Sequence, residues 1–242
     1  MAYVSGTPLD MKQLHFDKTP SASRSGAGQA RPYVKVSRSA GGEQVAFQLG
    51  KRLRDSTRCP FGLEKTHADA AENEPYKVLK LELNESARHA IASLEGATVE
   101  AAVASSEAWF PSKKKLSQST VEENFQTKIY SSTSSDGSFP CLLKLKVAVS
   151  GERQTKVLVT HEKAGGGYSK PVAGSWSDLT RGCKVLPCIK VSGGVYIVNR
   201  SYGTSLVATE LCVVKEKKSA PVELDLGSDV DDGSECDPEA DE

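Results

Sequence analysis

The sequence lacks any long hydrophobic run: nowhere do about 18 apolar residues follow one another, which is the minimum for a membrane-spanning helix. The first ten residues also lack the charged and then apolar layout of a signal peptide. We therefore expect an intracellular protein with no membrane partner. In a reducing compartment its six scattered cysteines are expected to be mostly small core or surface residues rather than a disulfide framework.

The sequence is also poor in groups that could form a catalytic or metal site. Its four histidines lie in separate segments, and Cys183 and Cys188 have no second Cys or His pair at zinc spacing. The glycine run at residues 165–167 fits neither of the phosphate-binding motifs that open a helix after a strand. Because no convergent set of reactive groups can be named, we expect a non-enzymatic protein with no cofactor and no bound metal.

Positive and negative residues are segregated along the chain, although the formal net charge is zero. Residues 223–242 hold ten acids and neither Lys nor Arg, so the rest of the chain has 31 basic residues against 21 acidic ones, a net charge of about +10. A basic body attracts polyanions, of which nucleic acid is the commonest. The alternative is a solubility tail on an ordinary protein. For residues 219–242 we expect a disordered acidic tail.

The N-terminal residues 1–58 are rich in Ser, Gly, Ala, Pro and basic residues, with ten bases against four acids. This composition predicts a flexible basic arm that could touch phosphates without a fixed fold. Short strands near residues 31–36 or 44–49 are the alternative.

The ordered domain is expected over residues 59–218. Lys and Glu alternate with Val and Leu over residues 76–83, which predicts a half-buried strand. Asn84 can cap a helix whose apolar residues recur at spacings of three and four. Ser119 and Glu122 have the spacing of a capping box, which predicts a second helix through Phe125, with an extension to Tyr130 as the alternative. The two helices form a helical insertion over about residues 84–130.

After residue 137 the apolar pattern changes to a period of two. It predicts strands at residues 142–149, 155–160, 183–191, 195–199 and 206–215, with glycine turns between most of them. The first two are expected to flank a turn at Ser150 and Gly151. Short strands with helices confined to the first half predict a mainly β fold, a small antiparallel barrel or sandwich with a helical insertion.

Basic and aromatic residues are interleaved on these strands. Lys144 and Lys146 share one face, because successive side chains of a strand point to opposite sides. An open barrel face with aromatic platforms and cations holds single-stranded nucleic acid without sequence preference, at roughly 1 to 3 kcal/mol per stacked base. The alternative is that the tyrosines cap a core and the lysines solvate a sheet face. The candidate nucleic-acid-binding residues are Lys113, Lys114, Lys115, Tyr130, Lys144, Lys146, Trp176, Lys184, Lys190, Tyr196, Arg200 and Tyr202.

The two tryptophans differ in context. Trp109 and Phe110 form a pair that would anchor the helical insertion, and the lysines that follow them are expected to touch phosphate. Trp176 lies in a Gly- and Ser-rich loop with less packing context, so it is the better candidate for stacking on a base.

Residues 61–215 contain a series of short landmarks. They are Phe61-Gly62-Leu63, residues 106–110 with the lysines after them, residues 121–125, Phe139-Pro140, residues 142–146, Arg181-Gly182, residues 195–197 before Asn199, Tyr202-Gly203 and residues 206–214. In this order they resemble the single-stranded-DNA-binding proteins of large eukaryotic DNA viruses, which are similar in turn to the phage-type single-stranded-DNA-binding proteins that have an OB-fold and an acidic tail.

The resemblance implies an OB-fold-like antiparallel barrel that coats displaced single-stranded DNA during replication, recombination or repair, in the nucleus or at a viral replication site. It also implies that the acidic tail contacts replication proteins and competes with DNA for the basic groove. The tail ends Ala240-Asp241-Glu242, without the terminal aromatic residue of the phage pattern. A homodimer is left open. The rival functions are a virion or chaperone-like structural protein with a solubility tail, and an RNA-binding regulator of the same fold.

Overall fold

The computed structural model describes residues 13–24, 30–38, 42–112, 114–130, 140–163 and 165–216. The predicted acidic tail and Lys113 lie outside the described residues. None of the described helices is long and apolar enough to cross a membrane.

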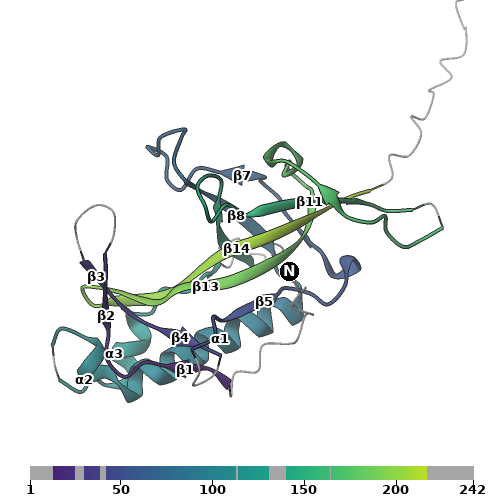
Figure 1. The fold of residues 1–242 in the computed structure, drawn as a ribbon. Coiled ribbons are helices and arrows are strands. Elements are labelled where there is room, and N and C mark those ends of the chain that lie inside the picture. Colours follow the sequence, from purple (N-terminus) through teal and green to yellow (C-terminus); the bar gives the residue numbers. More distant parts are fainter. Residues whose placement is uncertain are drawn as a thin grey trace, which may run out of the picture.

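A long antiparallel hairpin organises the molecule (Figure 1). Its strands are β13 (Lys184–Val198) and β14 (Ser201–Lys215), and Asn199 turns the chain between them with a φ of 57°. The predicted strands at residues 183–191 and 195–199 are in fact one strand, β13, with a register shift between Val191 and Val195. Gly194 permits the shift: its φ is 81°, and a Cβ there would collide with the Val34 carbonyl.

The sheet around this hairpin is mixed. Strands β10 (Leu142–Ala148) and β11 (Lys156–His161) were predicted to flank a turn, as the two strands of a hairpin do. In the structure they do not pair with each other. Each pairs in parallel with β14 instead, β10 at residues 207–208 and β11 at residues 210–215. On its other side β10 pairs antiparallel with β8 (Tyr76–Glu82). Three two-residue strands complete this half: β7 (Leu63–Glu64), β9 (Ile129–Tyr130) and β12 (Val172–Ala173).

Short strands within residues 30–38 and 42–58 join the sheet in place of the predicted flexible arm, in agreement with the alternative of strands near residues 31–36 and 44–49. The short strands of the N-terminal segment are β1 (His15–Phe16), β2 (Ser21–Arg24), β3 (Ala30–Val34), β4 (Val36–Ser37), β5 (Ala46–Gln48) and β6 (Thr57–Arg58), of which β1 and β4 form a separate two-stranded sheet. Three of them, β3, β5 and β6, pair with β13, and β2 pairs with β3. Val34, Val45 and Leu49 are buried in the core. The segment folds because these apolar side chains cover β13, a gain that composition alone does not reveal.

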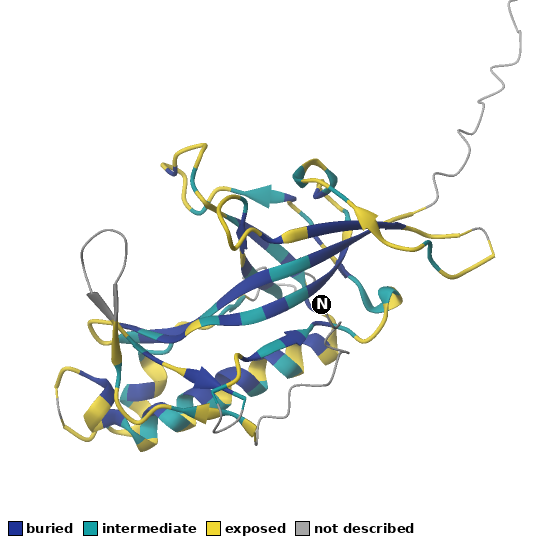
Figure 2. Cartoon of the chain, viewed as in Figure 1, coloured by how far each residue is buried: buried dark blue, intermediate teal, exposed yellow. Residues whose placement is uncertain are grey.

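The helical insertion lies between β8 and β10, as predicted. Its helices are α1 (Glu85–Ala104), α2 (Ser106–Trp109) and α3 (Gln118–Glu123). Asn84 caps α1 by accepting a hydrogen bond from Ala87 N at 2.8 Å, whereas the cap of α3 is Ser117 rather than Ser119. In Figure 1, α1 runs alongside the long hairpin, and Figure 2 shows that its buried residues fall on one side. Trp109 is buried and its Nε1 donates to Asp17 O at 3.2 Å, so this tryptophan is structural.

The predicted fold class is confirmed in its coarse form: a mainly β body with a helical insertion. Two details differ from the expected antiparallel barrel. The pairings of β14 with β10 and β11 are parallel, and the described pairings follow an open path from β2 to β7 rather than a closed ring.

Candidate nucleic-acid interface

The pleat of β10 and β8 separates apolar from basic side chains. Leu143 and Leu145 of β10 are fully buried, and so is Leu79 of β8, which lies opposite Leu145. Lys144 therefore projects from the other face of the sheet, where it lies directly opposite Lys80 of β8. Two cations thus stand side by side on the face turned away from the core.

The same face continues across β14 to β13. Val207 of β14 is in register with Lys146 of β10 on one side and with Lys190 of β13 on the other. Neighbouring residues in register point to the same side of a sheet, so Lys146 and Lys190 flank Val207 on the face that carries Lys144. The sequence predicted a shared face for Lys144 and Lys146 alone, and the register of β14 adds Lys190 of β13 to that face.

Tyr196 of β13 supplies an aromatic ring on this face. It lies opposite Gly203, where an added Cβ would come within 3.0 Å of the tyrosine hydroxyl and 2.8 Å of Gln126 O. Lys128 Nζ donates to the Tyr196 hydroxyl at 3.2 Å and lies 5.1 Å from the centre of its ring. This cation–π contact orders the lysine and the tyrosine together.

Tyr130 and Phe61 are two further aromatic side chains at this surface. Tyr130 is 46% exposed and lies opposite Leu142, on the face of Lys144. Burial raises the pKa of Tyr130, with a smaller contribution from Tyr196, so the two tyrosines lie near each other. At the other side of the face, Lys80 Nζ lies 5.1 Å from the ring centre of Phe61, which is 49% exposed.

A buried carboxylate fixes the segment between α3 and β9. Glu95 of α1 accepts hydrogen bonds from Lys128 N at 2.6 Å and from Thr127 Oγ1 at 2.8 Å. Burial raises the pKa of Glu95 despite these bonds, and burial likewise lowers the pKa of Lys128. Lys128 O in turn accepts from Lys144 N at 3.1 Å, which joins the segment to β10. Glu95 thus positions Lys128 and Tyr130 beside the lysines of the sheet.

We call this surface the basic–aromatic face. It comprises Phe61, Lys80, Lys128, Tyr130, Lys144, Lys146, Lys190 and Tyr196. Acids at its border are paired: Glu64 lies 3.0 Å from Lys80 Nζ, and Glu82 lies 3.8 Å from Arg58. Rings that can stack on bases alternate here with cations that can meet phosphates, the combination that single-stranded nucleic acid requires.

Three predicted site residues stand apart from this face. Tyr202 is fully buried, with its ring edge-on to Phe110 and Phe125 at 5.3 Å each, which corrects its predicted stacking role. Lys184 begins β13, at the opposite end of that strand from Tyr196, and its Nζ is paired with Glu216 at 2.7 Å. Trp176 is half-buried, lies in a short 3₁₀ helix and packs against the hydrophobic core. Its ring is therefore a core contact rather than the open platform that its loop composition predicted.

The remaining predicted cations lie at the hairpin tip. Arg200 is exposed and lines a cavity of about 540 Å³ together with Phe110, Asn124 and Asn199. Lys114 and Lys115 are exposed and lie in the segment between α2 and α3. Pro111 and Leu116 of the same segment line this cavity. The structure therefore divides the predicted residues between the basic–aromatic face and this tip.

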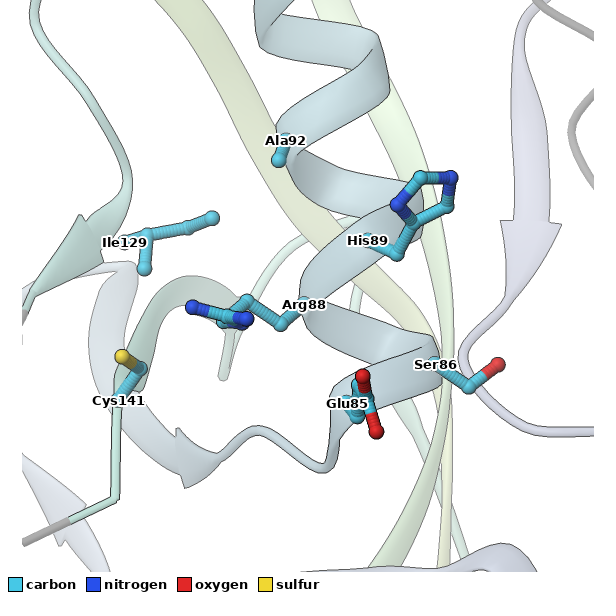
Figure 3. A pocket seen from close by; sticks show the side chains of 7 residues that line it. All are labelled: Glu85, Ser86, Arg88, His89, Ala92, Ile129 and Cys141. Carbon is cyan, nitrogen blue, oxygen red and sulfur yellow. The ribbon is translucent and has the colours of Figure 1, made fainter.

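A second cavity, of about 700 Å³, opens at the start of α1 (Figure 3). Arg88 extends across it towards Ile129 and Cys141, whereas His89 points away to another side of the helix. Ile129 is in register with the buried Leu143, so it points to the side of β9 opposite Tyr130, and the cavity lies on the helix side of the sheet. Its lining also includes Glu85, so both charge signs are present.

Sequence reasoning missed Phe61, Lys80 and Lys128. Lys80 was recoverable, because the alternation of residues 76–83 already placed it on the polar side of a strand. Lys128 was hidden within a predicted extension of the second helix, which ends at Glu123 in the structure. Phe61 had no periodic pattern around it and reaches the face through its contact with Lys80.

No protein-family model matches the chain, and no curated protein sequence matches it significantly. Among solved structures, the single-stranded DNA-binding protein from bacteriophage Enc34 in complex with ssDNA is similar over 82% of this chain and 97% of that chain, with a TM-score of 0.41 and 10% identity. Gp2.5, a single-stranded DNA-binding protein encoded by bacteriophage T7, is similar over 81% of this chain and 100% of that chain, with a TM-score of 0.37 and 13% identity. At this level of similarity we base the function on the side chains of this chain.

Proposed function

We propose that this chain is a non-enzymatic single-stranded-DNA-binding protein that coats and protects DNA strands exposed during replication, recombination or repair. The basic–aromatic face carries the proposal. Five lysines and three exposed or half-buried rings lie together at this surface: alternation and register bring together those on strands, and cation–π contacts add Phe61 and Lys128. The site of action that we propose is intracellular, in the nucleus or at a viral replication site.

The mechanism is sequestration. Bases of the strand stack on Tyr130, Tyr196 and Phe61, and the lysines between these rings replace the counterions of the phosphates. Stacking requires unpaired bases, so the face selects single strands over a duplex, in which the base faces are covered. The bound strand cannot re-anneal while its bases are stacked on the protein.

The acidic tail is proposed to act as a tethered competitor. Its ten acids are joined to a body of about +10, so the local concentration of negative charge near the face is high. It also offers a surface for basic replication proteins when DNA occupies the face. A homodimer remains part of the proposal to be tested.

A competition experiment tests the function. Labelled oligo(dT) bound to the full chain is challenged with unlabelled single-stranded DNA, duplex DNA and single-stranded RNA of matched length. Efficient displacement by single-stranded DNA and weak displacement by duplex is the expected result. Equal or better displacement by RNA would favour the RNA-binding regulator. No binding to any nucleic acid, together with a large protein-only assembly on gel filtration, would favour the structural protein.

A further inference from the structure

Cys59 and Cys183 lie opposite each other where β6 joins the start of β13. The register pairs Arg58 with Lys184, so one further step along both strands brings Cys59 opposite Cys183. Cys59 N donates to Cys183 O at 2.8 Å, which confirms that the two residues are neighbours. A second bond, from Gly182 N to Cys59 O at 2.7 Å, makes the junction a β-bulge in which Gly182, with a φ of 81°, and Cys183 together face Cys59.

The spacing of such a pair suits a disulfide. Facing residues of antiparallel strands have Cα atoms about 4.5 to 5.5 Å apart, inside the range of about 4.4 to 6.8 Å that disulfides need. Cys188 and Cys212 provide the contrast, because Cys188 lies opposite Glu210 and Cys212 lies opposite Leu186. Diagonal neighbours of this kind are about 7 to 8 Å apart, so that pair cannot be bridged without moving a strand.

The two thiols also interact. The neighbouring Cys183 thiol lowers the pKa of Cys59, and Cys59 in turn raises that of Cys183, while Cys59 Sγ donates to Gly62 O at 3.5 Å. Cys59 is fully buried and Cys183 is half-buried. The sulfur with more thiolate character is thus reached only by a small reagent, and Cys183 is the residue that faces it.

We propose that Cys59 and Cys183 form an oxidative modification site that closes to an intramolecular disulfide when the protein meets a peroxide. The Cys59 thiolate attacks one oxygen of hydrogen peroxide, breaking the O–O bond and giving a sulfenic acid and hydroxide. The Cys183 sulfur then attacks the Cys59 sulfur, the S–O bond breaks, and the oxygen leaves as water with the thiol proton. Two electrons pass from the two thiols to the peroxide.

The bridge joins β6 to β13 without changing their register. Because it closes a long loop of chain, it restricts the unfolded ensemble, and the Tm should rise by several degrees. Oligo(dT) affinity should stay within about twofold, because the basic–aromatic face keeps its geometry. The proposal does not depend on the DNA-binding function, because it is tested by the mass of the protein, by its linked peptides and by its Tm.

Treatment of the full, folded chain with hydrogen peroxide tests it, followed by intact mass and non-reducing peptide mapping. We expect the loss of two hydrogens, one linked peptide pair containing Cys59 and Cys183, and a Tm rise that dithiothreitol reverses. The matched variant C188S/C212S should behave alike. C183S should gain oxygen instead of forming the link, with its folding checked by thermal unfolding. Stepwise oxygen addition to the unmodified chain without the link, or links spread over many cysteines, would overturn the proposal.

Discussion

Lys144 of β10 lies directly opposite Lys80 of β8, on the sheet face turned away from the buried Leu143 and Leu145. Like charges in this position repel each other and destabilise a sheet. Glu64 offsets part of the repulsion through its contact with Lys80 at 3.0 Å. The repulsion between the two lysines is relieved when a polyanion binds across both of them, so the pair favours the bound state.

Replacing Lys144 by Gln should therefore have opposite effects on binding and on stability. The free energy of unfolding should rise by about 0.2 to 1 kcal/mol, because the repulsion with Lys80 is relieved. Oligo(dT) affinity should fall, and the slope of log K against log salt should become shallower by about 0.7, the contribution of one phosphate contact on a single strand. Urea unfolding and fluorescence anisotropy measure the two effects. Lys163→Gln, in the connection after β11, is the matched control and should change neither.

Tyr196 should act as a stacking platform. Tyr196→Ala removes the ring and should cost about 1 to 3 kcal/mol of binding free energy, on the order of tenfold to a hundredfold in affinity. Tyr196→Phe keeps the ring but loses the hydrogen bond from Lys128 Nζ, so it should retain most of the affinity. Equal losses in both variants would show that the hydroxyl rather than the ring contacts DNA. Tyr168→Ala, outside the face, serves as the control.

Tyr202 should affect stability rather than binding. Its hydroxyl is buried without a hydrogen-bond partner among the described residues, which costs about 1 to 3 kcal/mol. Tyr202→Phe should therefore raise the free energy of unfolding by about 1 kcal/mol, while Tyr202→Ala should lower it by about 3 to 5 kcal/mol through the cavity left between Phe110 and Phe125. Neither change should alter the oligo(dT) affinity of the folded protein. A selective loss of affinity in Tyr202→Phe would return this residue to the interface.

Glu95 gives the stability a pH dependence. Burial raises its pKa in the folded state above the ordinary value of about 4.3. The folded state therefore holds the proton more tightly than the unfolded state, and stability falls as pH rises from the ordinary pKa through the raised one. Glu95→Gln removes this decline, so its advantage over the wild type should grow between about pH 4 and pH 7 in urea unfolding. If the difference in unfolding free energy between Glu95→Gln and the wild type stayed constant over this range, Glu95 would not be the source of the pH dependence.

Deleting residues 223–242 should raise oligo(dT) affinity at low salt, because a tethered polyanion no longer competes for the face. The gain should shrink as salt screens both interactions. A matched control keeps the tail length and replaces its acids by Asn and Gln; it should bind as the deletion does. Unchanged affinity in both variants would leave the tail without a competitive role.

The sequence predicted the elements with clear periodicity and missed those that depend on distant partners. Strand β8 and helix α1 with its Asn84 cap follow directly from local pattern. The short strands β3, β5 and β6 have too few residues for a pattern, and only pairing with β13 orders them. The turn after β10 resembles a hairpin locally, but β14 is long enough to pair in parallel with β10 and β11 in turn.

The candidate site divides in the same way. Alternation alone placed Lys144 and Lys146 on one face, and the register of β14 added Lys190 to it. Nothing local distinguished the half-exposed Tyr196 from the buried Tyr202, because they stand on opposite faces of one hairpin and only the helices decide which face is covered. Composition likewise could not show that Trp176 packs against the core.

The most direct test of the basic–aromatic face is an anisotropy titration of the full chain with labelled oligo(dT) over about 50 to 200 mM salt, beside a variant that combines Lys144→Gln, Lys190→Gln and Tyr196→Ala. The wild type should bind tightly at low salt, and the logarithm of its binding constant should fall steeply and linearly with the logarithm of the salt concentration. The variant, shown to be folded by its thermal unfolding, should bind far more weakly and with a shallower slope. Equal affinity and slope for the two proteins would contradict the account.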